Sequence, residues 1–170
     1  MKNKSIYPEL FNFKNLIRSG WKKREIKGRL ESDAEHCYSM IILALEYMSK
    51  YPNDLNQLKV LKMIAYHDLG ELDAGDITPV DNVPVEEKEA NELKGIKRLA
   101  TTYDMPEIET IWLEFQKQET PESHFVKMID KLDAVKQARM YSDQQNRPEV
   151  FEEFHSRALN VIKPLDDLNL

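Results

Sequence analysis

Apolar residues recur at every third or fourth position along most of this chain, the spacing that gathers them on one face of an α-helix. Segments with this pattern predict seven helices, at about residues 7–18, 33–50, 58–69, 85–103, 106–118, 121–143 and 148–162. The segment at 58–69 is apolar nearly all round, which is typical of a central, buried helix. The pattern therefore predicts an all-α, single-domain helical bundle of about seven helices.

Residues with known capping preferences mark several of these helix ends. Ser32 and Glu35 have the spacing of a capping box that opens the helix at 33–50. Thr120 before Pro121 predicts an N-cap followed by the first helical residue, and Ser19-Gly20 is expected to end the first helix. The segments expected to be loops are a basic one at 21–30 and irregular ones at 71–76 and 76–85. The expected apolar face of the helix at 33–50 comprises Ala34, Cys37, Tyr38, Ile41, Ile42, Leu45 and Met48.

The composition agrees with a helical globular protein. Of the 170 residues, 41% are hydrophobic and 32% are charged, and five glycines and eight prolines are few for a fold rich in strands and turns. The length suits one domain, residues 1–170. The net charge of −6 argues against non-specific binding to nucleic acid through a basic surface. A phosphate ester would therefore need a local cation in its site.

The sequence favours a cytoplasmic location. Cys37 is the single cysteine, so an internal disulfide is excluded and a reducing compartment is expected, with Cys37 a buried, unreactive thiol. No apolar run approaches the ~20 residues of a membrane span. The basic N-terminal residues 1–5 precede no apolar region, so a signal peptide is not expected.

The adjacent pair His67-Asp68 ends the most apolar helix and is the first candidate for chemistry. Imidazole and carboxylate both bind divalent metals. Neighbouring helix positions diverge by about 100°, so further ligands must come from other segments. His36 lies on the preceding predicted helix and Asp130 and Asp133 on a later one, and the spacing leaves open which aspartate binds. The alternatives are an exposed helix-end pair at 67–68, an exposed His36 in a first turn, and ion pairs of Asp130 with Lys127 or Lys131.

Five short motifs over about residues 10–145 resemble one branch of a known family. They are Arg18-Ser-Gly-Trp21, Glu31-Ser-Asp-Ala-Glu-His36, His67-Asp-Leu-Gly-Glu71, Gly75-Asp-Ile-Thr-Pro79 and Thr120-Pro-Glu-Ser-His-Phe-Val-Lys-Met-Ile-Asp130-Lys. Their order is similar to that in the HD-domain metal-dependent phosphohydrolases, in the branch of the 5′-deoxynucleotidases and related small HD-domain proteins. The resemblance implies the all-α HD fold.

The resemblance also implies roles for individual residues. It assigns Asp130, rather than Asp133, to the metal. It gives Arg18 and Trp21 to the nucleotide pocket, with Arg24 as an alternative to Arg18, and with a solvated arginine and a core tryptophan as the alternative readings. Leu30 replaces a usual proline, and His124 stands where a longer polar residue is common, as either a neighbour of the site or an exposed side chain. The implied metal ligands are His36, His67, Asp68 and Asp130, and the implied catalytic residues are Glu71, for the attacking water, and Asp76, for the leaving oxygen.

The activity that the resemblance implies is hydrolysis of deoxyribonucleoside 5′-monophosphates to nucleoside and phosphate, with one divalent ion (Mn²⁺, Co²⁺, Fe²⁺ or Mg²⁺). Two alternatives stay open: another nucleotide substrate (cyclic, triphosphate or analogue), or a non-catalytic metal-binding regulatory module. The expected partner is a small-molecule nucleotide, not nucleic acid or a membrane. Relatives suggest a homodimer, and the face with Trp112 and Phe115 is either core or interface.

Overall fold

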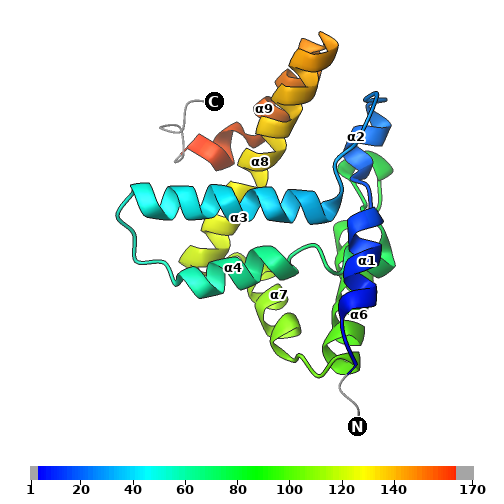
Figure 1. Ribbon diagram of the computed structural model, residues 1–170, viewed down its shortest axis with the longest axis vertical. Helices are drawn as coiled ribbons and strands as arrows, with labels where there is room; N and C mark the ends of the chain where they lie inside the picture. Colours follow the sequence, from blue (N-terminus) through cyan, green and yellow to red (C-terminus); the bar gives the residue numbers. More distant parts are fainter. Residues whose placement is uncertain (1–3, 164–170) are drawn as a thin grey trace.

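The longest helix, α8, runs through the molecule and contacts α3, α4, α7 and α9 (Figure 1). The computed structural model describes residues 4–163, so the first three residues of the basic N-terminus lie outside it. Its helices are α1 (Tyr7–Asn15), α2 (Ser19–Lys23), α3 (Asp33–Lys50), α4 (Gln57–Tyr66), α5 (Glu71–Ala74), the 3₁₀ turn η1 (Pro79–Asp81), α6 (Val85–Thr102), α7 (Glu107–Lys117), α8 (Pro121–Gln145) and α9 (Pro148–Ile162). No strand occurs within residues 4–163, which confirms the all-α fold and all seven predicted helices.

The helices form two groups around α8. Helix α9 returns along the upper part of α8, while α3 crosses α8 and α4 lies beside α3 (Figure 1). Helix α7 packs between α4, α6 and α8. On the other side, α1 and α6 stand close together, and the short α5 contacts both of them. The first turn of α3, the end of α4 and the middle of α8 are thereby brought together.

The main core fills the space between α3, α4, α7 and α8. Met40, Ile64 and Ile129 have no exposed surface, and burying a side chain of this size contributes roughly 1.5–3 kcal/mol. Trp112 and Phe115 of α7 also belong to this core. Of the two alternatives for this face, core or interface, the structure shows core. A second cluster lies between α2, α8 and α9, and comprises Trp21, Ile26, Ala138, Tyr141 and Val150.

The first helix ends earlier than expected. Helix α1 stops at Asn15, because Leu16 is extended at φ −77°, ψ 104°. The next residues pair with the segment before α3: the N–H of Arg18 donates to Glu31 O at 3.1 Å, and the N–H of Asp33 donates to Leu16 O at 2.9 Å. This pairing, which links positions distant in sequence, replaces the last helical turn predicted at 16–18.

Two predicted loops contain short helices. Ser19 begins α2 instead of ending a helix, and Trp21 anchors α2 because its side chain is buried in the second cluster. Residues Glu71–Ala74 form α5, not part of a loop, and Gly75 ends it with a positive φ of 77°. The segment at 76–85 is irregular as expected, apart from η1.

The capping predictions are confirmed, but the predicted apolar face of α3 is partly wrong. Ser32 and Glu35 form the capping box, and Thr120 caps α8. Three of the predicted face residues, Tyr38, Ile42 and Leu45, are exposed. Cys37 and Met48 of the predicted face are buried as expected, and His36, Met40 and Ala44 are buried in addition, because α3 packs against both α4 and α8. None of the helices described is both long and apolar enough to cross a membrane.

Candidate active site

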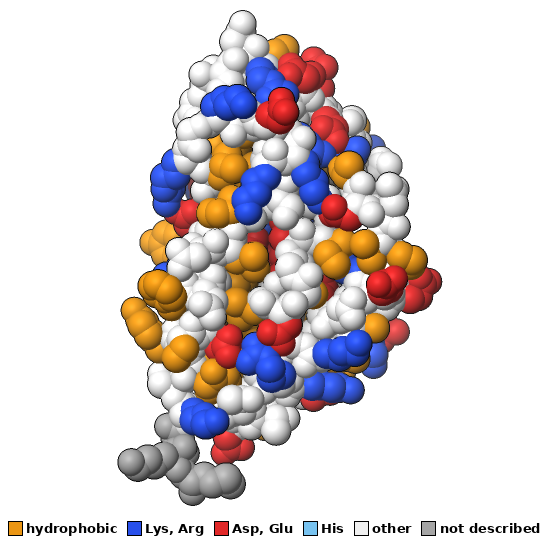
Figure 2. Space-filling view, turned by 90° about the vertical axis from the view of Figure 1, so that its right-hand side faces the viewer, with side chains coloured by type: hydrophobic (Ala, Val, Ile, Leu, Met, Phe, Trp, Pro, Cys, Tyr) orange, Lys and Arg blue, Asp and Glu red, His pale blue; other side chains and the backbone are white. Residues whose placement is uncertain are grey.

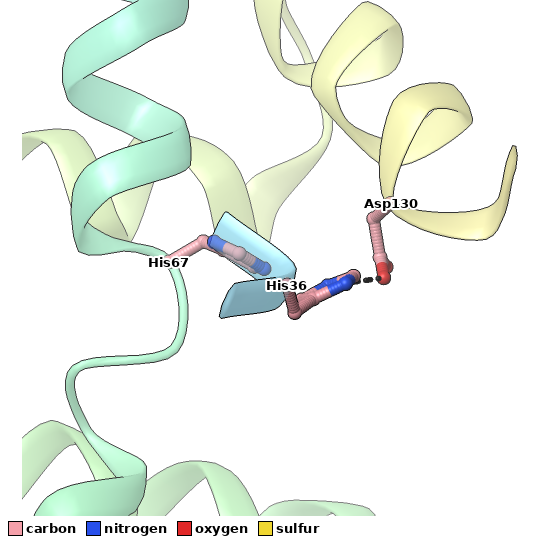
Figure 3. Close-up of side chains that lie close together, drawn as sticks. All are labelled: His36, His67 and Asp130. Atoms are coloured by element: carbon pink, nitrogen blue, oxygen red, sulfur yellow. Dashed lines mark ion pairs between the residues drawn. The ribbon is translucent and has the colours of Figure 1, made fainter. Parts of the chain in front are cut away.

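The imidazole of His36 is fixed in orientation by a carboxylate. His36 lies in the first turn of α3 with no exposed surface. Its Nδ1 donates a hydrogen bond to Oδ2 of Asp133 at 2.6 Å, so Nε2 is turned away from Asp133. That Nε2 lies 3.4 Å from Oδ1 of Asp130 and 4.0 Å from Oδ2 of Asp68. Asp133 therefore orients His36, and Asp130 faces the same space as Nε2 (Figure 3).

The second imidazole, that of His67, is oriented by backbone groups. His67 follows the last residue of α4 and is buried. Its Nδ1 donates to the carbonyl of Ile64 at 2.8 Å, while Trp112 Nε1 donates to the carbonyl of His67 at 3.1 Å. The free Nε2 lies 3.1 Å from Oδ2 of Asp68. Both histidines thus present Nε2 toward neighbouring carboxylates.

This donor set fits a divalent cation. Among the residues described, Nε2 of His36 and Nε2 of His67 are buried and have no hydrogen-bond partner. Such unsatisfied atoms cost about 1–3 kcal/mol each. Ligand atoms of His36, His67 and Asp130 all lie within 4.8 Å of one another, and Figure 3 shows their side chains converging. Two imidazole nitrogens beside carboxylate oxygens are ligands that first-row divalent metals and zinc accept, and hydrogen bonds at Nδ1 are the usual support.

Protons and metal cations compete for the side chains of this centre. Burial would raise the pKa of Asp130, but the nearby Lys131, Lys127 and His36 hold it well below its ordinary value. Burial lowers and the neighbouring carboxylates raise the pKa of both imidazoles, with a net rise that is large for His67. Because a metal needs neutral imidazole, metal binding at this site must release protons. Both lysine pairings proposed from the sequence are present, at 3.6 Å for Lys127 and 3.1 Å for Lys131.

A second group of carboxylates, Asp33, Glu71 and Asp76, adjoins the centre, with oxygen atoms within 4.8 Å of one another. Asp33 is fully buried, and burial together with repulsion from Asp68 raises its pKa to about 7 despite Arg18 nearby. Burial and the same kind of repulsion, from Asp68 and Asp76, raise the pKa of Glu71 well above its ordinary value. Oε2 of Glu71 has no hydrogen-bond partner within the described part of the chain, so it is available to a bound molecule.

These side chains line a pocket with a volume of about 450 Å³, in the range of small-molecule sites. Acidic side chains lie inside a hollow on the face that carries α1, α2 and α6, with lysine and arginine side chains at its edges (Figure 2). The basic side chains of the wall come from four helices or their flanks and are Arg18, Arg24, Lys88, Lys127, Lys131 and Arg157. Cationic side chains therefore lie at the edges of the pocket, while its floor holds His67, Asp68 and Asp130.

The residues expected to bind substrate line this pocket with different partners. Arg18 forms an ion pair with Asp68 at 3.3 Å, beside the two imidazoles. Arg24 pairs with Glu153 of α9 at 2.6 Å, farther along the wall. Trp21 is 1% exposed and donates from Nε1 to Glu31 at 2.9 Å. Arg18 is therefore nearer the chemistry than Arg24, and Trp21 forms part of the packed wall.

Two other residues singled out in the sequence are His124, which lies on the surface, and Cys37, whose Sγ lies within 4.8 Å of ligand atoms of His67 and Asp68. His124 is exposed on α8, where its Nε2 donates to the carbonyl of Gln118 at 2.6 Å. Cys37 is buried, and burial raises the pKa of its thiol, in agreement with an unreactive cysteine.

Several residues in or beside the pocket could not be identified from the sequence. Asp33 carries a weak signal, since it stands three positions before His36 on the same helix. Lys88 and Glu92 form an i,i+4 pair on α6, which reads as an ordinary exposed pair until α6 is placed beside α5. Phe154 and Arg157 of α9 reach the pocket through packing on α8, a tertiary contact that no local pattern reveals.

Comparisons with known proteins agree with this geometry. A family model described as HD domain matches residues 11–167. The 5′-deoxynucleotidase HDDC2 of Bos taurus is 32% identical over 145 residues, covering 84% of this chain and 69% of that protein. The 5′-deoxynucleotidase hdd1 of Schizosaccharomyces pombe is 34% identical over 155 residues, covering 85% of this chain and 76% of that protein. The crystal structure of the PH0347 protein of Pyrococcus horikoshii is similar with a TM-score of 0.78 and 28% identity, covering 92% of this chain and 87% of that one.

Proposed function

This chain belongs to the HD-domain family, and from that premise we propose that it is a metal-dependent 5′-deoxynucleotidase. It hydrolyses deoxyribonucleoside 5′-monophosphates to nucleoside and inorganic phosphate. The observation that carries the proposal is the pair of buried, unpartnered Nε2 atoms of His36 and His67 beside Asp68 and Asp130. Each Nε2 faces a carboxylate oxygen, at 3.4 Å for His36 and 3.1 Å for His67, without a hydrogen bond between them, an arrangement that a cation bound between nitrogen and oxygen would satisfy.

The proposed ligands are His36, His67, Asp68 and Asp130. A bound divalent cation supplies positive charge that offsets the phosphoryl oxygens and makes water more acidic. Nitrogen and carboxylate ligands together accept Mn²⁺, Co²⁺, Fe²⁺ or Mg²⁺.

Glu71 and Asp76 are the proposed proton-transfer residues. As a water molecule attacks phosphorus, the carboxylate of Glu71 accepts its proton through the unpartnered Oε2. The bond between phosphorus and the 5′-oxygen breaks, and Asp76 provides the proton that the leaving oxygen needs. Asp76 is held in place by the backbone N–H of Ser19, which donates to its Oδ2. Oxygen atoms of the two carboxylates lie within 4.8 Å of one another, so the proton that Glu71 takes from water can pass to Asp76 and restore it for the next turnover.

Arg18 is the proposed contact to the substrate phosphate, since its guanidinium lies beside Asp68 at the floor of the pocket. Trp21, packed between Glu31 and Phe154, fixes the wall against which the sugar and base rest. Arg24 is the alternative phosphate contact. One alternative function, hydrolysis of another nucleotide, would use the same metal ligands. The other, a regulatory module without turnover, would not need Glu71 and Asp76.

The nucleotide is the proposed small-molecule partner, and the chain is proposed to act in the cytoplasm as a homodimer. The acidic net charge of −6 disfavours nucleic acid as a partner.

A substrate screen tests the proposed activity. Protein stripped with a chelator and reloaded with Mn²⁺, Co²⁺, Fe²⁺ or Mg²⁺ is assayed for product release from ribo- and deoxyribonucleoside mono- and triphosphates and from cyclic nucleotides. We expect release from deoxyribonucleoside monophosphates in the loaded protein and none in the stripped protein. Release from cyclic nucleotides or triphosphates alone favours the other nucleotide substrates, and metal binding without any release favours the regulatory module.

A further inference from the structure

Two glycines bring α5 unusually close to α6. A Cβ added to Gly70 would lie 2.8 Å from the Cβ of Glu92 and 2.9 Å from its carbonyl oxygen. A Cβ on Gly95 would lie 3.1 Å from the carbonyl oxygen of Gly70. The backbones of the two helices are therefore in direct contact at the residue that precedes Glu71. This contact sets the side chains of α6 beside the carboxylate of Glu71.

The side chain of α6 that meets Glu71 is Lys88. Its Nζ lies 3.7 Å from Oε1 of Glu71 and 3.2 Å from Oε1 of Glu92. Both glutamate side chains are only 7% exposed, whereas Lys88 is 33% exposed. Burying two carboxylates is costly unless each meets a cation. The single ammonium of Lys88 lies within ion-pair distance of both carboxylates and offsets part of this cost, so the three residues form one linked group that lines the pocket.

The group leaves one oxygen of Glu71 free. Lys88 contacts Oε1 of Glu71, while Oε2 has no hydrogen-bond partner within residues 4–163. Glu92 lies one helical turn after Lys88. Its carboxylate pairs with the ammonium of Lys88 and keeps that ammonium at the pocket rather than in solvent. Burial lowers the pKa of Lys88, but Glu92 and Glu71 raise it further, which agrees with a charged lysine.

We infer that Lys88 and Glu92 are positioning residues for the proposed base: Lys88 fixes one oxygen of Glu71 so that the other faces the attacking water, and Glu92 fixes Lys88. This role rests on the proposed function. It differs from a direct contact between Lys88 and the substrate phosphate, which would contribute to binding rather than to the proton transfer. Misplacing a reacting group by about 1 Å costs up to about 10²-fold in rate.

The experiment measures kcat, KM and metal content in Lys88→Met, Lys88→Arg and Glu92→Gln, beside the parent. We expect Lys88→Met to lower kcat about 10- to 100-fold, with KM and metal content unchanged. Lys88→Arg should restore most of kcat because it retains the charge. Glu92→Gln should lower kcat less, in the same direction. Lys94→Met, an exposed position on the same helix, is the matched control and should equal the parent.

A double-mutant cycle separates positioning from other roles. Because Lys88 acts through Glu71, Lys88→Met in a Glu71→Gln background should lower kcat no further. Urea unfolding of the same four proteins should also show non-additive losses, a readout that needs no activity. If Lys88→Met does not fold, Glu92→Gln in the same cycle tests the contact.

Several results would overturn this role. A higher KM at unchanged kcat would make Lys88 a substrate contact. A kcat loss that adds fully to that of Glu71→Gln, or loss of metal in Lys88→Met, would also contradict it. An active parent with an unaffected Lys88→Met overturns the positioning role alone, whereas a parent that releases no phosphate overturns the proposed function as well.

Discussion

His36 and His67 each use Nδ1 for a hydrogen bond within the protein, to Asp133 and to the carbonyl of Ile64. These bonds select the tautomer whose Nε2 is free to bind a metal, and they hold each ring before any ligand arrives. Asp130 and Asp133 share a face of α8 but have different tasks, since Asp130 faces Nε2 of His36 and Asp133 faces its Nδ1. The sequence spacing alone left these two aspartates equivalent.

The difference between the two aspartates predicts different losses of metal affinity. Asp130→Ala removes a proposed ligand and should abolish metal binding measurable by calorimetry. Asp133→Ala removes only the hydrogen bond that orients His36 and should weaken binding by about 10- to 100-fold. Equal losses in both variants, or a larger loss in Asp133→Ala, would reverse the assignment.

Glu71→Gln separates metal binding from proton transfer. The amide keeps the shape of the side chain but cannot accept the proton of water, so kcat should fall by about 10²- to 10⁴-fold. Metal content and nucleotide affinity by calorimetry should stay near those of the parent. Metal lost with the carboxylate would make Glu71 a ligand, and undiminished turnover would remove it from the mechanism.

The raised pKa of Asp33 predicts that the free energy of unfolding of the metal-free protein depends on pH. The pKa of Asp33 is raised to about 7 in the folded state from an ordinary 3.8, so between these values the folded state holds a proton that the unfolded state has lost. The free energy of unfolding should therefore decrease as pH rises from about 4 to 7, by on the order of 2–4 kcal/mol from this group.

Asp33→Asn tests that dependence because asparagine stays neutral. In urea unfolding with a chelator present, the variant and the parent should be similarly stable near pH 4, and the variant should become progressively more stable than the parent as the pH rises to 8. Parallel pH curves for the two proteins would show that Asp33 titrates normally.

At the scale of helices, α5 depends on its close contact with α6. Gly70→Ala places a methyl group against the backbone of Glu92, at 2.9 Å from its carbonyl oxygen. The helices must then separate, at a cost of about 1–3 kcal/mol, and Glu71 moves with α5. We expect lower stability in urea and lower kcat together.

Gly20→Ala is the control for stability, since its added Cβ would meet only ordinary contacts at 3.8 Å and 3.9 Å. Its free energy of unfolding should match or exceed that of the parent. A Gly70→Ala protein as stable and active as the parent would show that α5 and α6 have room to adjust.

The sequence predicted the existence of the helices better than their ends. The long helices follow from periodicity and from caps such as Ser32 and Thr120, whose partners lie within the same turn. The end of α1 depends instead on pairing between Leu16 and Asp33, and α2 depends on Trp21 packing against α9. Such contacts join distant positions, so no local pattern contains them. The exposed Tyr38, Ile42 and Leu45 show the same limit for the faces of α3.

At the scale of the whole molecule, the convergence of the four proposed ligands could be predicted from the sequence, whereas the walls of the pocket could not. The resemblance carried over residue by residue to His36, His67, Asp68 and Asp130, which the fold brings together from three helices or their ends. The walls come from α2, α6, α8 and α9, and α9 lies beyond the motif-bearing stretch of about residues 10–145. Substrate choice depends on these walls. The assignment of residues 1–170 to one domain stays a prediction.

The metal content and phosphate release of His67→Ala, measured beside His124→Ala on matched preparations, test the proposed metal centre most directly. His67 presents a buried, unpartnered Nε2 to the site, whereas His124 is exposed and bonded to Gln118. We predict that His67→Ala retains neither metal by elemental analysis nor release of phosphate from a deoxyribonucleoside 5′-monophosphate, and that His124→Ala retains both. Full metal occupancy and turnover in a folded His67→Ala would contradict the account.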